Sequence, residues 1–322
     1  MSPRRLPLVV VTAPLPGDAL SLAEGRARVR VVKVKAGDEG ALARHLRKAE
    51  GAVVLLSHPV TARVLQACPH LRVVSNYAVG LDNVDLDAAR RRGVRVTYTP
   101  DVLTEATADL AWALLLAVAR RVVEGDRLVR RGRFRGWAPS LCLGMDLGGK
   151  TLGIVGMGRI GKAVARRALP FGMRVLYHNR RPLLPSEEAA LGARFEELDR
   201  LLALSDVVSL HCPLTPETRH LLSAERLAAM KKGAILLNTA RGPVVDEAAL
   251  VRSLREGHLL GAGLDVYERE PALTPGLADL PNVVLLPHVG SAGRETRETM
   301  ARMALGDCLQ VLEGREPDHP AV

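Results

Sequence analysis

The stretch "LGIVGMGRIG", residues 152–161, decides the fold of this chain. An apolar run typical of a buried strand leads into a turn with Gly156-x-Gly158-x-x-Gly161, and an amphipathic helix follows at once. In such a unit the first glycine allows a tight turn and the second lets a pyrophosphate approach the backbone. The third lets the helix pack closely on the strand. The stretch therefore predicts a dinucleotide-binding site rather than a structural turn without a ligand.

The helix that follows the turn begins at Arg159 and Ile160. A helix N-terminus offers unpaired N–H groups and a partial positive charge, and both favour phosphate. We therefore expect the backbone at these two residues to contribute to cofactor binding.

The next strand ends in "YHNRRPL", residues 177–183, where a dinucleotide site usually has an acid for the ribose hydroxyls. Here that place is taken by Asn179, followed by Arg180 and Arg181. A carboxylate would repel a 2′-phosphate, whereas an amide does not, and a guanidinium binds phosphate with two donors. The sequence predicts NADPH as the preferred cofactor, with NADH possible. The alternative is that the two arginines are solvated loop charges.

The pattern on both sides of the glycine turn alternates strands and helices, which is typical of parallel α/β sheets. Long helices are expected over 104–132, and one more near the C-terminus. We predict an α/β fold with two Rossmann-like, doubly wound parallel sheets. The predicted strands of the first hundred residues cover 7–13, 51–57, 71–78 and 93–100. Those of the six-stranded second sheet cover 150–158, 173–179, 206–213, 234–240, 261–266 and 282–288.

Composition narrows the functional classes. The 322 residues are 48% hydrophobic, enough for two cores, and no apolar run is long enough for a membrane span. The net charge of +10 favours anionic ligands. Only 3% of residues are aromatic and no base-reading motif occurs, so nucleic acid is not an expected partner. The scattered Cys68, Cys142, Cys212 and Cys308 predict no metal site and a reduced, cytoplasmic protein.

Several long motifs in the second half resemble the D-isomer-specific 2-hydroxyacid dehydrogenases. They are "HCPLTPETRHLLS" (211–223), "MKKGAILLNTARGPVVDEAALVRSLREGHLLGAGLDVYEREP" (230–271) and "NVVLLPHVGSA" (282–292). The resemblance runs from about residue 50 to the C-terminus. "SNYAVGLDNVDLDAARRRGVRVTYTPDVLTEATADLAWALLL" (75–116) is similar to the glyoxylate reductase/hydroxypyruvate reductase branch.

The resemblance implies a two-domain subunit with a cleft. Residues 1–100, completed by the C-terminal helix region 291–322, would form the substrate-binding domain, and residues 101–290 the NAD(P)-binding Rossmann domain. The family is usually dimeric, so a homodimer through the helices after Asp101 is expected.

Three residues match the catalytic positions of the family. Arg241 in "NTARGP" and His288 in "LLPHVG" each follow a strand, at the edge where open α/β sheets bind ligands. A guanidinium suits a substrate carboxylate, an imidazole can donate a proton near neutral pH, and the Glu270 carboxylate would orient and charge the imidazole. Taken singly, Arg241 could be a capping residue and Glu270 a solvated charge; the joint match favours catalysis.

The resemblance assigns further residues to the cofactor and the substrate. Asp265 would lie by the nicotinamide amide. Val79 and Gly80 would hold the substrate carboxylate or keto oxygen with their N–H groups, as a pair of amides can. Trp137 in "RFRGWAP" would form a substrate wall in the partner subunit's pocket or simply pack in the interface. The remaining cofactor contacts are expected from Thr107, Cys212, Pro213, Thr218, Thr239, Ala240 and Gly290.

The expected function is reduction of glyoxylate or hydroxypyruvate to glycolate or D-glycerate with NADPH. Val79 stands where related phosphite dehydrogenases have a lysine, which argues against phosphite as the substrate. The 322 residues contain no regulatory domain like that of the longer phosphoglycerate dehydrogenases, which argues against that activity. One alternative is a dehydrogenase for a larger D-2-hydroxy acid, which the pocket wall near Leu56 and Ser57 would decide. A less favoured one is a nucleotide-sensing corepressor like the C-terminal-binding proteins.

Overall fold

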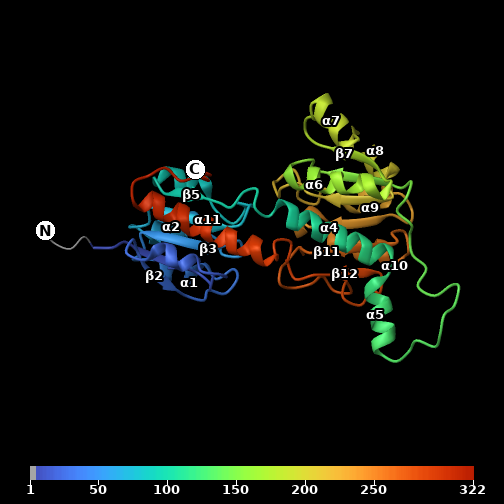
Figure 1. The fold of residues 1–322 in the computed structure, drawn as a ribbon, viewed down its shortest axis with the longest axis horizontal. Coiled ribbons are helices and arrows are strands. Elements are labelled where there is room, and N and C mark those ends of the chain that lie inside the picture. The colour runs from blue at the N-terminus through green and yellow to red at the C-terminus, as the bar shows by residue number, and fades with distance from the viewer. Residues whose placement is uncertain (1–4) are drawn as a thin grey trace. The chain divides into compact units, whose positions relative to one another are not determined.

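The computed structural model describes residues 5–322, so the first four residues of the predicted 1–100 domain lie outside the described part. The chain forms two compact units (Figure 1). Unit 1 contains the chain up to Leu103 together with Ser291–Val322, and unit 2 contains Thr104–Gly290. Each has its own parallel sheet and its own hydrophobic cores.

Unit 2 is built on a seven-stranded parallel sheet in the order β12-β11-β10-β9-β6-β7-β8. The order reverses between β6 and β9, where the strands on either side run outward in chain order. Ligands of open α/β sheets bind at such a reversal, beyond the carboxyl ends of the strands. The strands are β6 (Thr151–Val155), β7 (Arg174–His178), β8 (Ala193–Phe195), β9 (Val207–Leu210), β10 (Ile235–Asn238), β11 (Gly261–Leu264) and β12 (Val283–Leu285).

Helices cover both faces of this sheet, which explains why its strands read as continuous apolar runs. One face is packed by α4 (Thr104–Ala119) and α6 (Arg159–Ala168), with Leu152 and Ile154 fully buried. The other face is packed by α8 (Leu198–Leu204), α9 (Ala224–Ala229) and α10 (Glu247–Arg255).

The second sheet corrects the six-stranded prediction, because β8 is a seventh strand. Its residues Ala193, Arg194 and Phe195 form no apolar run, and only Ala193 is buried at this edge of the sheet. The short helix α7 (Pro185–Leu191) that precedes β8 buries only Leu191, so it leaves no pattern either. The long helical region after residue 104 is two helices. Arg121 has a left-handed φ of 50° and separates α4 from α5 (Val122–Arg130).

Unit 1 holds a five-stranded parallel sheet in the order β2-β1-β3-β4-β5. The edge strand β2 was not predicted, because its side chains are largely exposed and include two arginines. The strands are β1 (Leu8–Val11), β2 (Arg28–Val31), β3 (Gly51–Leu55), β4 (Val73–Tyr77) and β5 (Arg95–Thr97). One face carries the helices α1 (Glu39–Leu46), α2 (Ala62–Ala67) and α3 (Leu86–Arg91).

The long C-terminal helix α11 (Arg294–Leu312) covers the other face of the unit 1 sheet. The chain then returns along β5, where Ala321 and Val322 donate their N–H groups to the carbonyl of Val96. Thus residues from both ends of the chain build one unit, and the predicted α/β class with two Rossmann-like parallel sheets is confirmed.

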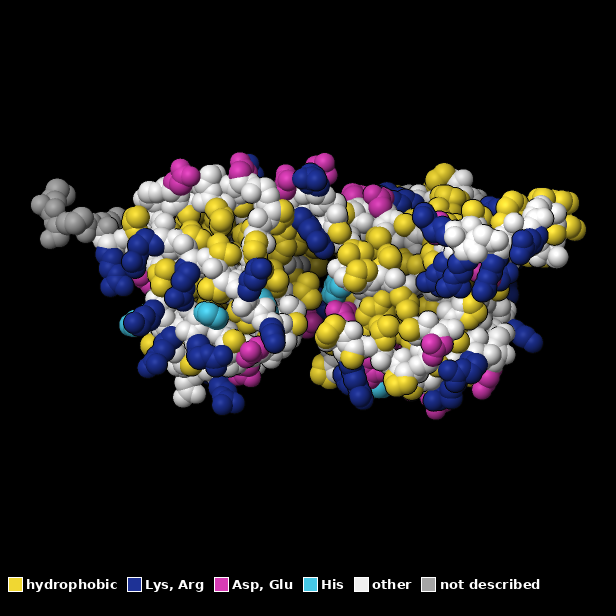
Figure 2. All heavy atoms as spheres, turned by 90° about the horizontal axis from the view of Figure 1, so that it is seen from below, with side chains coloured by type: hydrophobic (Ala, Val, Ile, Leu, Met, Phe, Trp, Pro, Cys, Tyr) yellow, Lys and Arg dark blue, Asp and Glu magenta, His cyan; other side chains and the backbone are white. Residues whose placement is uncertain are grey.

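Two surface properties bear on partners. Figure 2 shows Lys and Arg side chains spread over the visible face, with Asp and Glu side chains among them. Among residues 5–322, no helix is long and apolar enough to cross a membrane.

Candidate active site

The glycine turn joins β6 to α6, and two of its three glycines are required by packing. Gly156 has a φ of 97°, and a Cβ there would lie 2.6 Å from the backbone nitrogen of Cys212. A Cβ on Gly161 would lie 2.4 Å from the carbonyl oxygen of Gly156. Both distances are shorter than any real Cβ contact, so neither position admits a side chain.

Gly158 is different, because nothing lies within 4 Å of where its Cβ would be. It has an ordinary φ of −81° and is the N-cap of α6. Neither strain nor packing therefore requires glycine at this position. The open space beside the backbone fits a pyrophosphate against the N–H groups at the helix start, Arg159 and Ile160 included.

Asn179, at the end of β7, is attached to the same turn. Its Oδ1 accepts a hydrogen bond of 2.6 Å from the N–H of Met157, the residue between the first two glycines. The Nδ2 group is then the part of this side chain that can donate to a ligand.

Arg180 and Arg181 follow Asn179 and are exposed. The buried Tyr177 holds the loop that carries them: its hydroxyl accepts the Leu183 N–H at 2.7 Å and donates to Glu188 at 2.6 Å. Arg180 also acts on Glu217. The pKa of the Glu217 carboxyl is lowered, mainly by the hydrogen bond from Thr215 and to a smaller extent by the charge of Arg180. Arg180 is thus within electrostatic reach of the loop after β9.

That loop contains three of the predicted cofactor residues, Cys212, Pro213 and Thr218. The Thr218 hydroxyl donates to the Pro213 carbonyl at 2.7 Å and accepts the Thr215 N–H at 2.7 Å, so it closes the loop on itself. Burial lowers the pKa of the His211 ring to about 4, so the ring is neutral at pH 7. A neutral imidazole at the end of β9 is not a proton donor at this pH.

The end of β10 places Thr239, Ala240 and Arg241 in a tight turn. Asn238 holds the turn: its Nδ2 donates to the Arg241 carbonyl at 2.9 Å, and its Oδ1 accepts the Ala240 N–H at 3.0 Å. The Thr239 hydroxyl oxygen is buried and has no hydrogen-bond partner among the described residues. A buried orphan hydroxyl at the strand edge fits a site that is completed by a polar ligand.

His288 and Glu270 form a pair beyond β12 and β11. The Nδ1 of His288 lies 2.9 Å from Oε2 of Glu270, whose Oε1 accepts the N–H of Tyr267 at 3.0 Å. Burial would raise the pKa of Glu270, but hydrogen bonding and the charges of His288 and Arg241 bring it below its ordinary value. Glu270 is therefore an ionised partner for His288, and the Arg241 charge is near enough to contribute.

Asp265 holds the backbone that carries His288. Its two side-chain oxygens accept the N–H groups of Val289 and Gly290, each at 2.7 Å. Burial raises the pKa of the Asp265 carboxyl, and these two hydrogen bonds oppose the rise. A Cβ on Gly290 would lie 3.3 Å from Asp265 and 3.5 Å from Thr107, so these three predicted cofactor residues are neighbours.

The remaining predicted residues lie elsewhere in the chain. Val79 and Gly80 are in the loop after β4 of unit 1, where Asn76 donates to the Gly80 carbonyl at 2.7 Å. Trp137 belongs to the segment after α5 and is 83% exposed.

Unit 2 thus brings its predicted catalytic and cofactor residues, Trp137 apart, to one edge of the sheet, because parallel strands end there together. Sequence reasoning missed the residues that hold them, chiefly Asn238, Tyr267 and the Met157 N–H. In the sequence, these residues are marked only by lying next to a motif residue. A spacing pattern does not show which groups will be hydrogen-bonded to one another. Within residues 5–322 there is no group of three or more His, Cys, Asp or Glu that could hold a metal ion.

Comparison with known proteins agrees with this geometry. Residues 112–290 match the family model described as D-isomer specific 2-hydroxyacid dehydrogenase, NAD binding domain. A glyoxylate reductase of Korarchaeum cryptofilum is 49% identical over 317 residues, which is 97% of this chain and 94% of that protein. One of Thermococcus litoralis is 46% identical over 316 residues, 97% and 95% of the two chains.

Solved structures give the same result. The TT0316 protein of Thermus thermophilus is 55% identical, with a TM-score of 0.91 over 98% of this chain and 100% of that one. An NADPH-dependent glyoxylate/hydroxypyruvate reductase of Sinorhizobium meliloti, solved with NADP and malonate, is 34% identical. Its TM-score is 0.87 over 98% of this chain and 97% of that one. The chain belongs to the D-isomer specific 2-hydroxyacid dehydrogenase family, and is an oxidoreductase with a nicotinamide dinucleotide site.

Proposed function

We propose that this chain reduces glyoxylate, and also hydroxypyruvate, with NADPH as the preferred cofactor. The observation that carries the proposal is the His288–Glu270 hydrogen bond beside Arg241, at the same sheet edge as the glycine turn. The similar proteins named glyoxylate reductase support glyoxylate as substrate. Unit 1 is proposed as the substrate-binding domain and unit 2 as the cofactor-binding domain.

His288 is proposed as the proton donor. Because its Nδ1 faces the Glu270 carboxylate, Nε2 is the nitrogen that can donate to a substrate oxygen. Glu270 stabilises the charged ring before the transfer and keeps it oriented. A reduced nicotinamide, when bound, would supply the hydride that the carbonyl carbon accepts. The carbonyl oxygen takes the His288 proton, so a 2-keto acid becomes a 2-hydroxy acid while the nicotinamide is oxidised.

The groups proposed to bind the substrate are the Arg241 guanidinium and the backbone N–H groups of Val79 and Gly80. The Arg241 guanidinium can hold the substrate carboxylate with two parallel hydrogen bonds and polarise the adjacent carbonyl. The N–H groups of Val79 and Gly80 are proposed as a second contact for the carboxylate or the keto oxygen. The pocket wall near Leu56, Ser57 and Val79 would discriminate between short and long acids.

The preference for NADPH is inferred from the end of β7. The Oδ1 of Asn179 accepts the Met157 N–H, so its Nδ2 group is the donor that can face a ligand. The guanidinium groups of Arg180 and Arg181 follow on an exposed loop. This set offers donors and positive charge, and it lacks the carboxylate that binds ribose hydroxyls in NADH sites. The NADP complex of the Sinorhizobium protein is consistent with this assignment.

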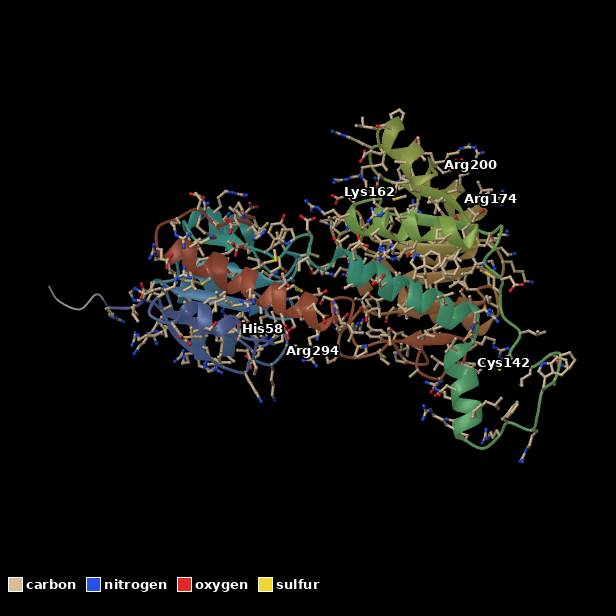
Figure 3. The ribbon with its side chains drawn as sticks, viewed as in Figure 1. His58, Cys142, Lys162, Arg174, Arg200 and Arg294 are labelled. Atoms are coloured by element: carbon tan, nitrogen blue, oxygen red, sulfur yellow. The ribbon has the colours of Figure 1, made fainter. Side chains whose placement is uncertain are left out.

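The first test is the initial rate with glyoxylate and with hydroxypyruvate, each with NADPH and NADH at one pH. We expect activity with both acids and a higher kcat/KM with NADPH. Arg180→Ala and Arg181→Ala should raise KM for NADPH more than for NADH. Arg174→Ala is the matched control, since Arg174 is an exposed arginine at the opposite end of the same strand (Figure 3).

The outcomes separate substrate from cofactor. Equal or better rates with NADH would refute the 2′-phosphate assignment and leave the arginines as loop charges. No activity with either acid, together with activity on a larger 2-keto acid, would move the function to another D-2-hydroxy acid. His288→Gln should abolish turnover while the affinity for NADPH, measured by fluorescence titration, is retained; normal turnover would refute the assignment of His288 as the acid.

A further inference from the structure

We propose that Glu247, which lies in the first turn of α10, is a positioning residue for the catalytic pair. The proposal rests on the proposed function of Glu270 and His288. Glu247 lies outside the predicted site and touches neither member of the pair. Its carboxylate instead holds the backbone segment from which Glu270 projects.

The segment begins with the peptide between Tyr267 and Glu268, which presses directly on Gly242. A Cβ on Gly242 would lie 1.8 Å from the carbonyl carbon of Tyr267 and 2.4 Å from the nitrogen of Glu268. Gly242 follows Arg241 in the chain. The backbone beside the substrate-binding cation and the backbone before the catalytic carboxylate are therefore in contact, with no side chain between them.

Glu247 holds the same peptide through its N–H group. Its Oε1 accepts the N–H of Glu268 at 2.7 Å, and its Oε2 accepts the Thr274 hydroxyl at 2.6 Å. The two donors lie on either side of Glu270 in the sequence, so one carboxylate bridges both ends of the segment that carries Glu270. Glu247 is only 2% exposed. A side chain this buried loses hydration, which its two hydrogen bonds must offset.

The preceding peptide, between Val266 and Tyr267, positions Glu270 directly. Its N–H, the Tyr267 N–H, donates to Oε1 of Glu270 at 3.0 Å, which leaves Oε2 to meet Nδ1 of His288 at 2.9 Å. The two peptides share the Cα atom of Tyr267, so a movement of the peptide that Glu247 holds is passed to the Tyr267 N–H. Oε1 of Glu270 then loses its donor, and Oε2 changes its distance from His288.

Other charged groups face these residues. Glu268 faces Glu247 and itself binds Nε2 of His220 at 2.8 Å, with Arg219 at 3.9 Å. Asp265 and Arg241 act on the Glu270–His288 pair. None of these groups replaces the two hydrogen bonds that Glu247 accepts.

The test compares four variants with the wild type. Glu247→Ala removes both acceptors. Glu247→Gln is the conservative variant, since its Oε1 can accept the Glu268 N–H and its Nε2 can donate to Thr274. Thr274→Val removes one of the two contacts, and Glu270→Gln removes the catalytic carboxylate itself.

Asp307→Ala is the matched control. Asp307 is also 2% exposed and also accepts one backbone N–H, from Asp318, and one side-chain donor, from His319. It lies on α11 in unit 1. A general loss of stability would affect both alanine variants alike.

Two readouts are used, and only one depends on turnover. The first is the pH dependence of kcat/KM for glyoxylate reduction. The second is the NMR titration of the ¹³C-labelled histidine Cε1 signals in the protein without cofactor, with His288 assigned from the His288→Gln spectrum. Thermal unfolding of each variant is recorded alongside.

We expect Glu247→Ala to move the pH midpoint of the His288 signal downward by about one unit, towards that of Glu270→Gln, because the carboxylate no longer supports the charged ring. The kcat/KM should fall by roughly tenfold to a hundredfold at pH 7, as a small displacement of a reacting group can cause. Glu247→Gln should keep both the His288 midpoint and kcat/KM near their wild-type values. Thr274→Val should shift the midpoint in the same direction as Glu247→Ala, but by less. Asp307→Ala should leave the His288 midpoint unchanged.

The failures are distinguishable. An unchanged His288 midpoint in Glu270→Gln would refute the assignment of the catalytic pair, and with it the proposed function. A shift in Glu270→Gln with none in Glu247→Ala and Thr274→Val would refute the role of Glu247 alone. If Glu247→Ala does not fold, Thr274→Val and Glu247→Gln decide, and a wild-type midpoint in Thr274→Val would count against the proposal.

Discussion

Asn179 has an observed structural contact and a proposed role in cofactor binding. Its oxygen is held 2.6 Å from the Met157 nitrogen, which ties the end of β7 to the glycine turn. An aspartate could make the same contact, so the structural role does not require an amide. The difference lies in the second polar atom, which is a donor in Asn and an acceptor with negative charge in Asp.

Asn179→Asp should therefore reverse the cofactor preference without disturbing the turn. The carboxylate keeps the contact to Met157, repels a 2′-phosphate and accepts from ribose hydroxyls. We expect the ratio of kcat/KM for NADPH to that for NADH to fall by about tenfold or more, since a hydrogen bond to a charged group is worth about 1.5–3 kcal/mol. Asn282→Asp adds the same charge at the other end of the sheet and should leave the ratio unchanged. An unaltered ratio in Asn179→Asp would contradict the prediction.

Two of the three glycines of the turn, Gly158 and Gly161, should respond differently to alanine. Gly161→Ala places a methyl group 2.4 Å from a carbonyl oxygen, and overpacking of this kind costs about 1–3 kcal/mol of unfolding free energy. Gly158→Ala meets open space and has an ordinary φ, so stability should change little while the affinity for the dinucleotide falls. Thermal unfolding and fluorescence titration with NADPH measure the two effects. Equal losses of stability in both variants would contradict the open space beside Gly158.

At the scale of elements, loops of unit 1 are tied together by a buried polar network. His58 follows β3 (Figure 3) and is almost completely buried. Its Nδ1 lies 2.8 Å from the Thr12 hydroxyl, and its Nε2 lies 3.2 Å from the Val34 carbonyl. Asn83 donates to the carbonyls of Leu55 and His58 at 3.2 and 3.1 Å, and it pairs with Asn76. The loop with Leu56 and the loop with Val79 and Gly80 are thereby cross-linked.

This network should make unit 1 sensitive to acid. Burial lowers the pKa of His58 in the folded chain, whereas the unfolded chain keeps the ordinary value near 6.5. Below pH 6.5 the unfolded state binds the extra proton, so the free energy of unfolding falls as pH falls, by up to about 1.4 kcal/mol per pH unit. His211, which lies in unit 2, gives the unfolding free energy of that unit a pH dependence of the same sign.

His58→Asn should be less stable than the wild type at pH 7.5 but should lose less stability between pH 7.5 and 5.5. Urea unfolding followed by circular dichroism at the two pH values measures both. His70→Asn, at an exposed histidine, is the control and should keep the wild-type difference. The same difference in His58→Asn as in the wild type would show that His58 is not the titrating group.

At the scale of the whole molecule, the segment after α5 exposes several large apolar side chains. Trp137 is 83% exposed and Phe134 50%, and Leu143 is exposed as well. Figure 3 shows Cys142 on this same segment, which is drawn without regular structure after α5. Beside it lies a cavity of about 260 Å³ whose lining includes Val118 and Val284. Exposed large apolar groups of this density are typical of an interaction surface.

The resemblance predicts a homodimer through the helices after Asp101, and we propose that this segment contributes to that interface. The wild-type chain should sediment at twice its monomer mass, and Phe134→Ser with Trp137→Ser should weaken the association at least tenfold, as the loss of buried aromatic anchors does. Leu204→Ser, at another exposed apolar residue of unit 2, is the control and should not change it. A wild-type monomer at all concentrations would refute the homodimer.

Much of the fold was predictable from the sequence, for physical reasons. Strands buried on both faces read as apolar runs, and the glycine spacing marks the one turn where backbone must approach backbone and ligand. The six predicted strands of unit 2 were found in this way. The elements that were missed include β2, β8 and α7. The first two are edge strands and the third is a short helix, and none buries enough side chains to leave a pattern.

The sequence by itself determined the chemistry of this protein: the glycine turn, the absence of an acid at position 179 and the identities of Arg241, Glu270 and His288. Only the tertiary structure decided how these groups are held. Asn238 holds the turn that directly follows its own strand, whereas Asp265 and Glu247 join a strand end and a helix start to segments more than twenty residues away. Such hydrogen bonds depend on which backbone groups the packing leaves unpaired, and that is settled only when the sheet and its helices have assembled.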